Sequence, residues 1–247
     1  MTADDPVVRP VCNARTPVLG PTALLVASHL DLKMLAGRLQ LPDSRQLYMS
    51  RLLYDAGQAE RPCLVGPLMG APYAVMILEI LRAWGVRKVL FFGWCGSIDP
   101  VFRIGDIVIP TSALIDEGTS LHYRKTREAE VHPDRSLCAA LQADLDDNGV
   151  DYKTGRVWTT DGIFRETPNK IEAFQRKGAN VVEMELSAIY SLAAFHDMAA
   201  AALLAVSDEL FTLTWKPGFT YRDFSASRNR IIERISAGPM LLRTETG

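Results

Sequence analysis

Short segments that are almost wholly apolar alternate along this chain with segments whose apolar residues recur at helical spacing. The apolar runs predict strands at 22–27, 62–68, 88–92, 104–110, 154–159, 181–184 and 200–207. The other segments predict helices at 31–39, 73–84, 133–148, 170–177, 186–196 and 223–236. Because these strands lack polar alternation, both faces of their sheet must be covered. The sequence therefore predicts an α/β fold, a single-domain three-layer α/β/α sandwich around a central mixed, mostly parallel sheet.

The chain shows no internal repeat and no long low-complexity linker, so its 247 residues predict one domain. Residues 1–20, which contain three prolines after a short acidic start, are expected to form an N-terminal arm before a domain at 21–247. The start lacks the apolar segment of a signal peptide, and the longest apolar stretches are too short to cross a bilayer. Four widely spaced cysteines favour reduced thiols. These features predict a cytoplasmic protein without a membrane partner.

Charge and missing motifs exclude several classes of function. The 27 Lys and Arg residues are balanced by 29 Asp and Glu residues, which disfavours a nucleic-acid partner. The chain has no G-x-G-x-x-G, P-loop, G-x-S-x-G or H-E-x-x-H motif, and its four histidines are scattered, so no metal site is expected. A small molecule bound at the carboxyl ends of the strands is the remaining expectation.

Two carboxylates, Glu183 and Glu185, stand at the end of the predicted strand 181–184. If the strand persists, both side chains lie on one face. Burying two carboxylates is costly unless each has a partner, and the two hydroxyls of a sugar are a suitable partner for one of them. The alternative is a solvated strand edge, which the surrounding apolar residues disfavour.

A further carboxylate, Asp208, comes directly after an apolar strand and Ser207. In a half-buried pocket its pKa would rise, and it could act as a general acid. The same Ser-Asp pair is also typical of a helix cap, and both interpretations stay open. Gly93 and Gly96 predict a tight turn after the strand 88–92, where the backbone can approach a ligand closely.

Taken in order, these segments resemble the nucleoside phosphorylase family, which includes purine and uridine phosphorylases and related nucleosidases. The resemblance extends over residues 22–210 and rests on the segments 66–70, 93–97, 104–110, 117–123, 159–161, 182–185 and 206–208. It implies that 21–247 is a catalytic domain that cleaves the bond between the ribose and the base of a nucleoside. It also implies a homodimer or homohexamer, and no cofactor other than phosphate as a candidate co-substrate.

The resemblance implies roles for individual residues. Glu185 would bind the ribose hydroxyls above Met184, and Asp208 would protonate the base as it leaves. The other expected substrate-binding residues are Glu183, Met69, Trp94, Cys95, Gly96, Ile163, Phe164 and Ser207. The base preference leans towards purines, because the Gln and Arg pair of uridine-cleaving members is not evident in 162–168, although 117–123 looks closer to uridine phosphorylases.

The phosphate-binding residues of the family are not evident. Asp31 stands about where an Arg is expected and Trp94 where a Ser or Thr is expected, whereas phosphate needs positive charge and donors. One hypothesis is that water replaces phosphate, with Asp31 as the general base. Three alternatives stay open. Asp31 could cap the following helix. The chain could be a purine or uridine phosphorylase with a divergent phosphate site, or it could bind nucleosides without activity.

Overall fold

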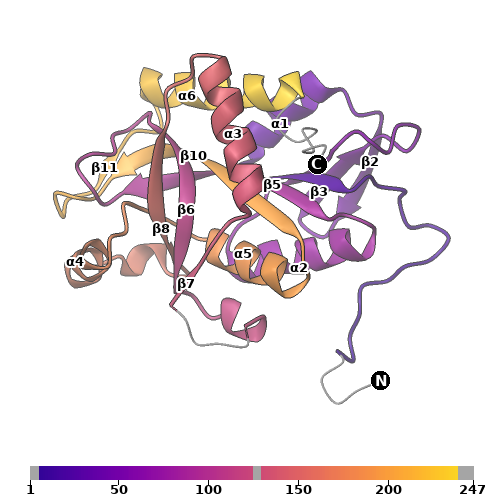
Figure 1. Cartoon of the computed structure of the whole chain (residues 1–247), viewed down its shortest axis with the longest axis horizontal. Helices are drawn as coiled ribbons and strands as arrows, with labels where there is room; N and C mark the ends of the chain where they lie inside the picture. The colour runs from indigo at the N-terminus through magenta and orange to yellow at the C-terminus, as the bar shows by residue number, and fades with distance from the viewer. Residues whose placement is uncertain (1–5, 125–128, 239–247) are drawn as a thin grey trace.

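An eleven-stranded mixed sheet runs through the centre of the protein, with helices on both sides (Figure 1). The structure is a computed structural model that describes residues 6–124 and 129–238. The strands are β1 (Thr22–Val26), β2 (Asp43–Leu47), β3 (Ser50–Tyr54), β4 (Cys63–Gly66), β5 (Lys88–Ser97), β6 (Ile107–Asp116), β7 (Glu130–Val131), β8 (Lys153–Thr160), β9 (Val181–Glu183), β10 (Ala199–Glu209) and β11 (Lys216–Pro217). The helices are α1 (His29–Leu39), α2 (Ala71–Ala83), α3 (Arg135–Asp147), α4 (Pro168–Arg176), α5 (Leu186–Phe195) and α6 (Arg222–Ala237), with short 3-10 turns η1 (Ser120–His122) and η2 (Ile163–Arg165).

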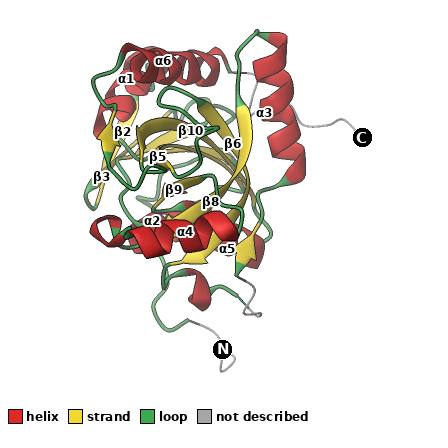
Figure 2. Cartoon of the chain, turned by 90° about the vertical axis from the view of Figure 1, so that its left-hand side faces the viewer, coloured by secondary structure: helices red, strands yellow, loops and turns green. Residues whose placement is uncertain are grey.

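Part of the sheet closes on itself. The strands follow the order β11-β10-β6-β8-β9-β5-β1-β4-β3-β2, and β10 also pairs with β5. The strands β10, β6, β8, β9 and β5 therefore form a closed ring, whose curvature Figure 2 shows. The long parallel pairing of β5 with β10 completes this ring, whereas β9 runs antiparallel to β5. Closure leaves these five strands without a free hydrogen-bonding edge.

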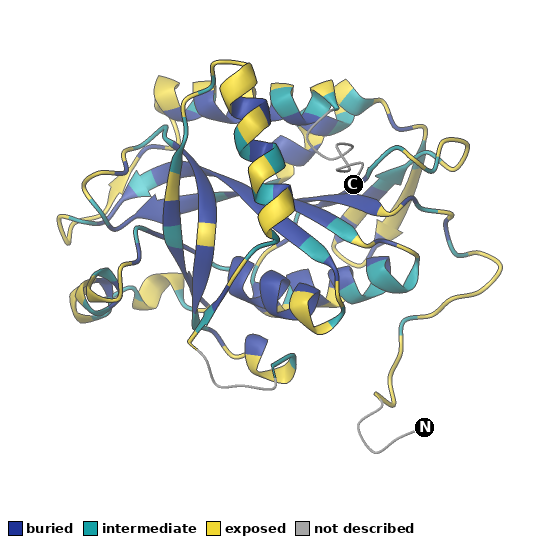
Figure 3. Ribbon diagram, viewed as in Figure 1, coloured by how far each residue is buried: buried dark blue, intermediate teal, exposed yellow. Residues whose placement is uncertain are grey.

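Two apolar layers hold the helices against the sheet. One layer joins α2 and α5 to the strands, and the other joins α1, α3 and α6 to the opposite face. The strand residues in the centre are buried and the outer helix surfaces are exposed (Figure 3). This arrangement confirms the predicted single-domain α/β/α fold. The described part of the predicted arm, residues 6–20, forms bends and turns without a helix or strand.

The structure corrects several boundaries. The predicted tight turn at Gly93–Gly96 is wrong, because β5 continues through both glycines to Ser97. The strand expected at 104–110 begins only at Ile107, because Gly105 adopts a positive φ of 93° in the preceding turn. The hairpin of β2 and β3 was not predicted, because the middle of β2 is polar and exposed. All four cysteines are free thiols, as expected.

Candidate active site

Three strands bring the predicted acidic residues together around Gly96. In the sheet register, Gly96 of β5 pairs with Asp208 of β10 on one side and with Val182 of β9 on the other. A Cβ atom at Gly96 would lie 3.1 Å from Asp208 Oδ2 and 2.6 Å from Leu210 Cδ1. A larger residue would therefore displace the Asp208 carboxyl group. Gly96 is required for this close approach, and not for the turn expected from the sequence.

Asp208 is held by a donor on each carboxyl oxygen. The Ser207 hydroxyl donates to Oδ1 at 2.6 Å, and the Trp215 indole N–H donates to Oδ2 at 2.9 Å. Burial raises the pKa of Asp208, while these two hydrogen bonds lower it, and the net shift is upward. The helix-cap interpretation is wrong, because Asp208 lies within β10 and no helix follows directly. This environment favours the protonated form of Asp208 more than water does, as a general acid requires.

Glu166 is a second carboxyl group near Asp208 that the sequence did not reveal. Burial and the charge of Asp208 raise the pKa of Glu166 to about 7, with Lys170 acting in the opposite direction. Glu166 directly follows the turn η2, within the segment 162–168. A lone Glu in a loop carries no recognisable motif, so only the fold identifies it.

Glu183 and Glu185 meet through a turn and not along a strand. The strand β9 ends at Glu183, and Glu185 occupies the N-cap position of α5, so the shared strand face expected from the sequence is wrong. Glu183 accepts hydrogen bonds from the Thr159 hydroxyl at 2.6 Å and from the N–H groups of Glu185 and Leu186 at 2.7 and 2.9 Å. Glu183 thus satisfies the first amides of α5 and fixes the position of Glu185.

The buried pair of Glu183 and Glu185 resists carrying two negative charges. Burial, followed by the charge of Glu183, raises the pKa of Glu185 to about 8. Burial raises the pKa of Glu183 to about 7, against its three hydrogen bonds. Since Glu183 has more donors, we assign the first negative charge to Glu183 and the proton to Glu185. Glu185 also accepts a hydrogen bond from the Gly70 backbone, which draws the 66–70 loop to the site.

The remaining predicted residues lie beneath or around these carboxyl groups. Cys95 is buried below them, and burial, Asp208 and Glu183 all raise its pKa. Met184 is half-buried beside Glu185. Met69, Ile163 and Phe164 are 78%, 54% and 96% exposed. Met69 precedes Gly70, which donates to Glu185, and Ile163 and Phe164 lie in η2, which Glu166 follows. Their contacts with a substrate stay predictions.

Asp31 is enclosed in a separate cluster, and the structure does not favour it as a general base. Its side chain is 1% exposed and forms an ion pair with Arg228 of α6. Arg228 Nε donates to Asp31 Oδ1 at 2.9 Å, and Trp94 Nε1 donates to Oδ2 at 2.7 Å. The helix-cap alternative is also wrong, because Ser28 caps α1. A carboxylate neutralised in this way is a poor proton acceptor.

The same cluster holds Trp94 by its hydrogen bond to Asp31 and by aromatic contacts. Its ring packs against Phe224 at 5.0 Å and Phe219 at 6.0 Å, and the Arg228 guanidinium lies over it at 5.0 Å. Arg228 was missed in the sequence because it lies within an ordinary amphipathic helix. Trp94 therefore packs between α1 and α6 and helps to hold them together.

Two hollows of about 550 and 340 Å³ lie beside α3, and none of the predicted site residues lines either of them. Among residues 6–124 and 129–238, no three His, Cys, Asp or Glu side chains are grouped so as to hold a metal ion. No helix within the same residues is long and apolar enough to span a membrane. The carboxyl groups around Gly96 are the candidate site.

Known proteins resemble this chain over most of its length. The sequence profile described as the phosphorylase superfamily matches residues 21–237. A DeoD-type purine nucleoside phosphorylase of Geobacillus kaustophilus is 31% identical over 63% of this chain and 66% of its own length. A protein of the same name from Caldanaerobacter subterraneus is 29% identical over 78% and 85%.

Solved structures share the fold. The AMP nucleosidase of Bacteroides thetaiotaomicron superposes with a TM-score of 0.69 at 24% identity, covering 89% of this chain and 87% of its own. The purine nucleoside phosphorylase of Toxoplasma gondii, in complex with immucillin-H, gives a TM-score of 0.74 at 18% identity, covering 89% and 90%. At these identities the structures establish the architecture alone.

Proposed function

The chain belongs to the phosphorylase superfamily, and from this membership we propose that it is an enzyme that cleaves the N-glycosidic bond of a purine-type nucleoside. The observation that carries the proposal is the placement of Asp208 and the 182–185 turn on either side of Gly96. Two kinds of group flank one short stretch of β5. On one side lies Asp208, whose pKa is raised, and on the other lies a carboxyl pair that can accept hydrogen bonds from hydroxyl groups. A nucleoside carries matching groups, because its base nitrogen can accept a proton from Asp208 and its ribose hydroxyls can donate hydrogen bonds to the carboxyl pair.

In the proposed reaction, Asp208 acts on the base, and the Glu183 and Glu185 pair on the other side of Gly96 acts on the ribose. Protonated Asp208 gives its proton to the departing base, which makes the base a better leaving group. As the bond breaks, the ribose acquires oxocarbenium character, and the negative charge of the Glu183 and Glu185 pair stabilises it. Glu185 binds the ribose hydroxyls over Met184. The purine preference draws support from the names of the two bacterial relatives.

Water is the proposed acceptor. The Arg228 guanidinium and the Trp94 N–H both serve Asp31, so neither is available to a phosphate ion. The Asp31 and Arg228 pair has no net charge and therefore offers no excess positive charge to an anion. Because Asp31 is paired, the proposal no longer includes it as the general base: water adds to the anomeric carbon of the ribose as the bond to the base breaks, and the proton that this water loses passes to solvent. A phosphorylase with a divergent phosphate site is the competing proposal. The homodimer or homohexamer stays a prediction that light scattering would test.

Chromatography of reaction mixtures tests this proposal. The purified protein is incubated with adenosine, inosine, methylthioadenosine or uridine, each with and without phosphate. We expect free purine base and free ribose in phosphate-free buffer, at a rate that phosphate does not increase. Ribose 1-phosphate as the product would overturn the choice of water. Absence of base release from every nucleoside in both buffers would overturn the enzymatic proposal.

The change Glu185→Gln is expected to weaken recognition of the ribose diol. Loss of the Glu185 carboxyl group, which hydrogen-bonds two hydroxyls in the proposal, should lower kcat/KM by about 10- to 100-fold. The variant should also lose the preference for a ribonucleoside over its 2′-deoxy analogue. Steady-state kinetics with both substrates provide the measurement. Glu172→Gln, on the exposed side of α4, is the matched control and should behave as wild type. If Glu185→Gln still prefers the ribonucleoside over its 2′-deoxy analogue, Glu185 does not bind the ribose diol.

A further inference from the structure

A short hairpin after β10 folds back over Asp208. The strands β10 and β11 are antiparallel, with Asp208 opposite Pro217 and Glu209 opposite Lys216. Trp215, directly before β11, is thereby brought to the Asp208 carboxyl group, where its indole N–H donates to Oδ2 at 2.9 Å. The Trp215 side chain is nevertheless 60% exposed. An aromatic residue that is exposed and yet hydrogen-bonded to the proposed acid requires an explanation beyond core packing.

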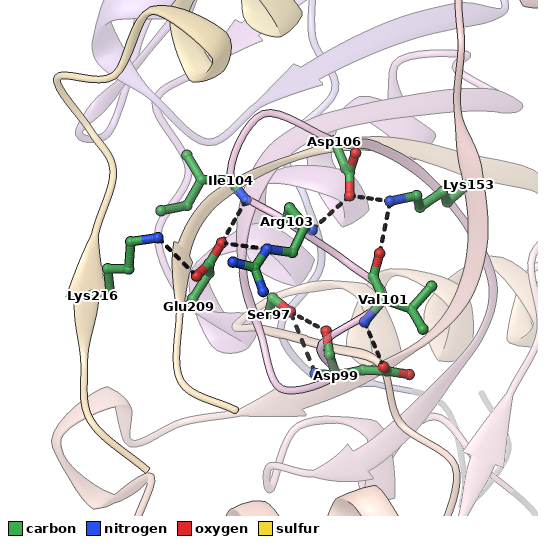
Figure 4. A network of polar contacts seen from close by, with 9 residues as sticks. All are labelled: Ser97, Asp99, Val101, Arg103, Ile104, Asp106, Lys153, Glu209 and Lys216. Carbon is green, nitrogen blue, oxygen red and sulfur yellow. Dashed lines mark hydrogen bonds and ion pairs between the residues drawn. The ribbon is translucent and has the colours of Figure 1, made fainter. Parts of the chain in front are cut away.

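Glu209 fixes the hairpin from the other face of β10. Its buried carboxylate accepts hydrogen bonds from Lys216 Nζ at 3.1 Å and from the Ile104 N–H at 3.2 Å, and it pairs with Arg103 Nε at 3.2 Å (Figure 4). The Gly218 N–H also donates to the Ser207 carbonyl at 2.9 Å. Trp215 is thus held against Asp208 by contacts that precede and follow it along the hairpin.

The two donors to Asp208 differ in chemistry. An indole N–H only donates, whereas a hydroxyl both donates and accepts. The Ser207 hydroxyl lies 2.6 Å from Asp208 Oδ1 and also 3.2 Å from the Cys95 carbonyl. It can therefore turn to Cys95 and accept a hydrogen bond from a protonated Oδ1. Trp215 offers no such exchange, so Oδ2 stays an acceptor in both states of Asp208.

Resting on the proposed function, we propose that Trp215 is a positioning residue: its indole N–H holds Oδ2 of Asp208 and thereby confines the transferable proton to Oδ1. The titratable groups that face Asp208 from other elements are Glu166, which follows η2, and Cys95 of β5. Neither donates a hydrogen bond to Oδ2, and Cys95 Sγ is directed to the Ala205 carbonyl. Trp215 is the side chain that fixes the orientation of the acid.

The change Trp215→Phe tests this role, since it keeps an aromatic ring and removes the donor. Loss of a hydrogen bond to the ionised form raises the pKa of Asp208. A general acid works while protonated, so the alkaline limb of the kcat/KM profile should move upward by about one pH unit. The loss of orientation should lower kcat about 10-fold. Trp84→Phe, which removes an indole bond to Val11 far from Asp208, is the matched control and should keep the wild-type profile.

A measurement without substrate separates this proposal from the proposed function. In the full-length protein, the indole N–H resonances of the four tryptophans are followed against pH. The Trp215 resonance, assigned from Trp215→Phe, should titrate with Asp208. The transition should persist in Glu166→Gln and vanish in Asp208→Asn. A resonance that does not titrate, or an unshifted alkaline limb in active Trp215→Phe, overturns the positioning role. Titration in a protein that releases no base rejects the proposed function while the contact stands.

Discussion

Replacing Asp208 by Asn is expected to lower kcat/KM for nucleoside cleavage by about 10²- to 10⁴-fold, the usual contribution of a general acid. Asparagine keeps the shape of the side chain but has no proton to give to the base. Its amide oxygen can accept from Trp215 and its NH₂ group can donate to Ser207, so the fold should be preserved. Single-turnover base release measures the loss, and calorimetric titration measures substrate binding, which should change little.

The matched control for this change is Asp197→Asn. Asp197 is exposed and has a positive φ of 51°, a conformation that Asn adopts as readily as Asp. This variant should keep wild-type activity and stability. In Asp208→Asn, residual activity should also lose the alkaline limb that Asp208 produces in the wild type. Full turnover by Asp208→Asn would remove Asp208 from the mechanism and leave Glu166 as the acid to test.

Replacing Asp31 by Ala is expected to reduce the free energy of unfolding by about 3–5 kcal/mol, because it leaves the charge of Arg228 buried and unpaired. Asp31 and Arg228 have side chains that are 1% and 7% exposed, so water cannot readily take over the pairing. Urea denaturation followed by fluorescence measures the change. The midpoint concentration of urea should fall, with little change in the slope.

The double variant Asp31→Ala with Arg228→Met separates a structural from a catalytic role of Asp31. Removing both charges should recover most of the lost stability, since an apolar pair often replaces a buried ion pair at little cost. It should also retain the activity of the wild type in phosphate-free buffer. A double variant that is stable but inactive would instead restore Asp31 as the general base, through an opening of its ion pair.

Local sequence patterns predict a helix or strand correctly where its own residues decide its structure. The apolar runs that form β1 and β10 predict buried strands, and their positions are confirmed. The strand β2 escapes prediction because its exposed polar side chains resemble a loop. Gly93 and Gly96 predict a turn by local propensity, whereas Gly96 is required by the carboxyl group of a neighbouring strand. Tertiary packing overrides the local preference there.

The candidate site shows the same limit. Asp208 and the 182–185 turn are recognisable because each stands at the end of an apolar strand and carries a motif. The role of Asp31 depends on Arg228, 197 residues further along the chain, and no local pattern joins them. Trp215 is similarly invisible, since an aromatic residue in a loop gives no sign that a hairpin returns it to Asp208. Long-range pairing decides what these residues do.

The closed ring of strands has a consequence for how substrate preference can diverge. β5 and β10 pair from Ala199 to Glu209 with one shift of register between Val206 and Asp208, so the acid and the carboxyl pair are both carried by paired strands of the ring. The exposed residues Met69, Phe164 and Trp215 lie outside these paired strands and can vary without changing the strand pairing. Related proteins of common descent could therefore differ in the nucleoside they prefer through changes in these exposed residues alone, while keeping the proposed catalytic carboxyl groups in place.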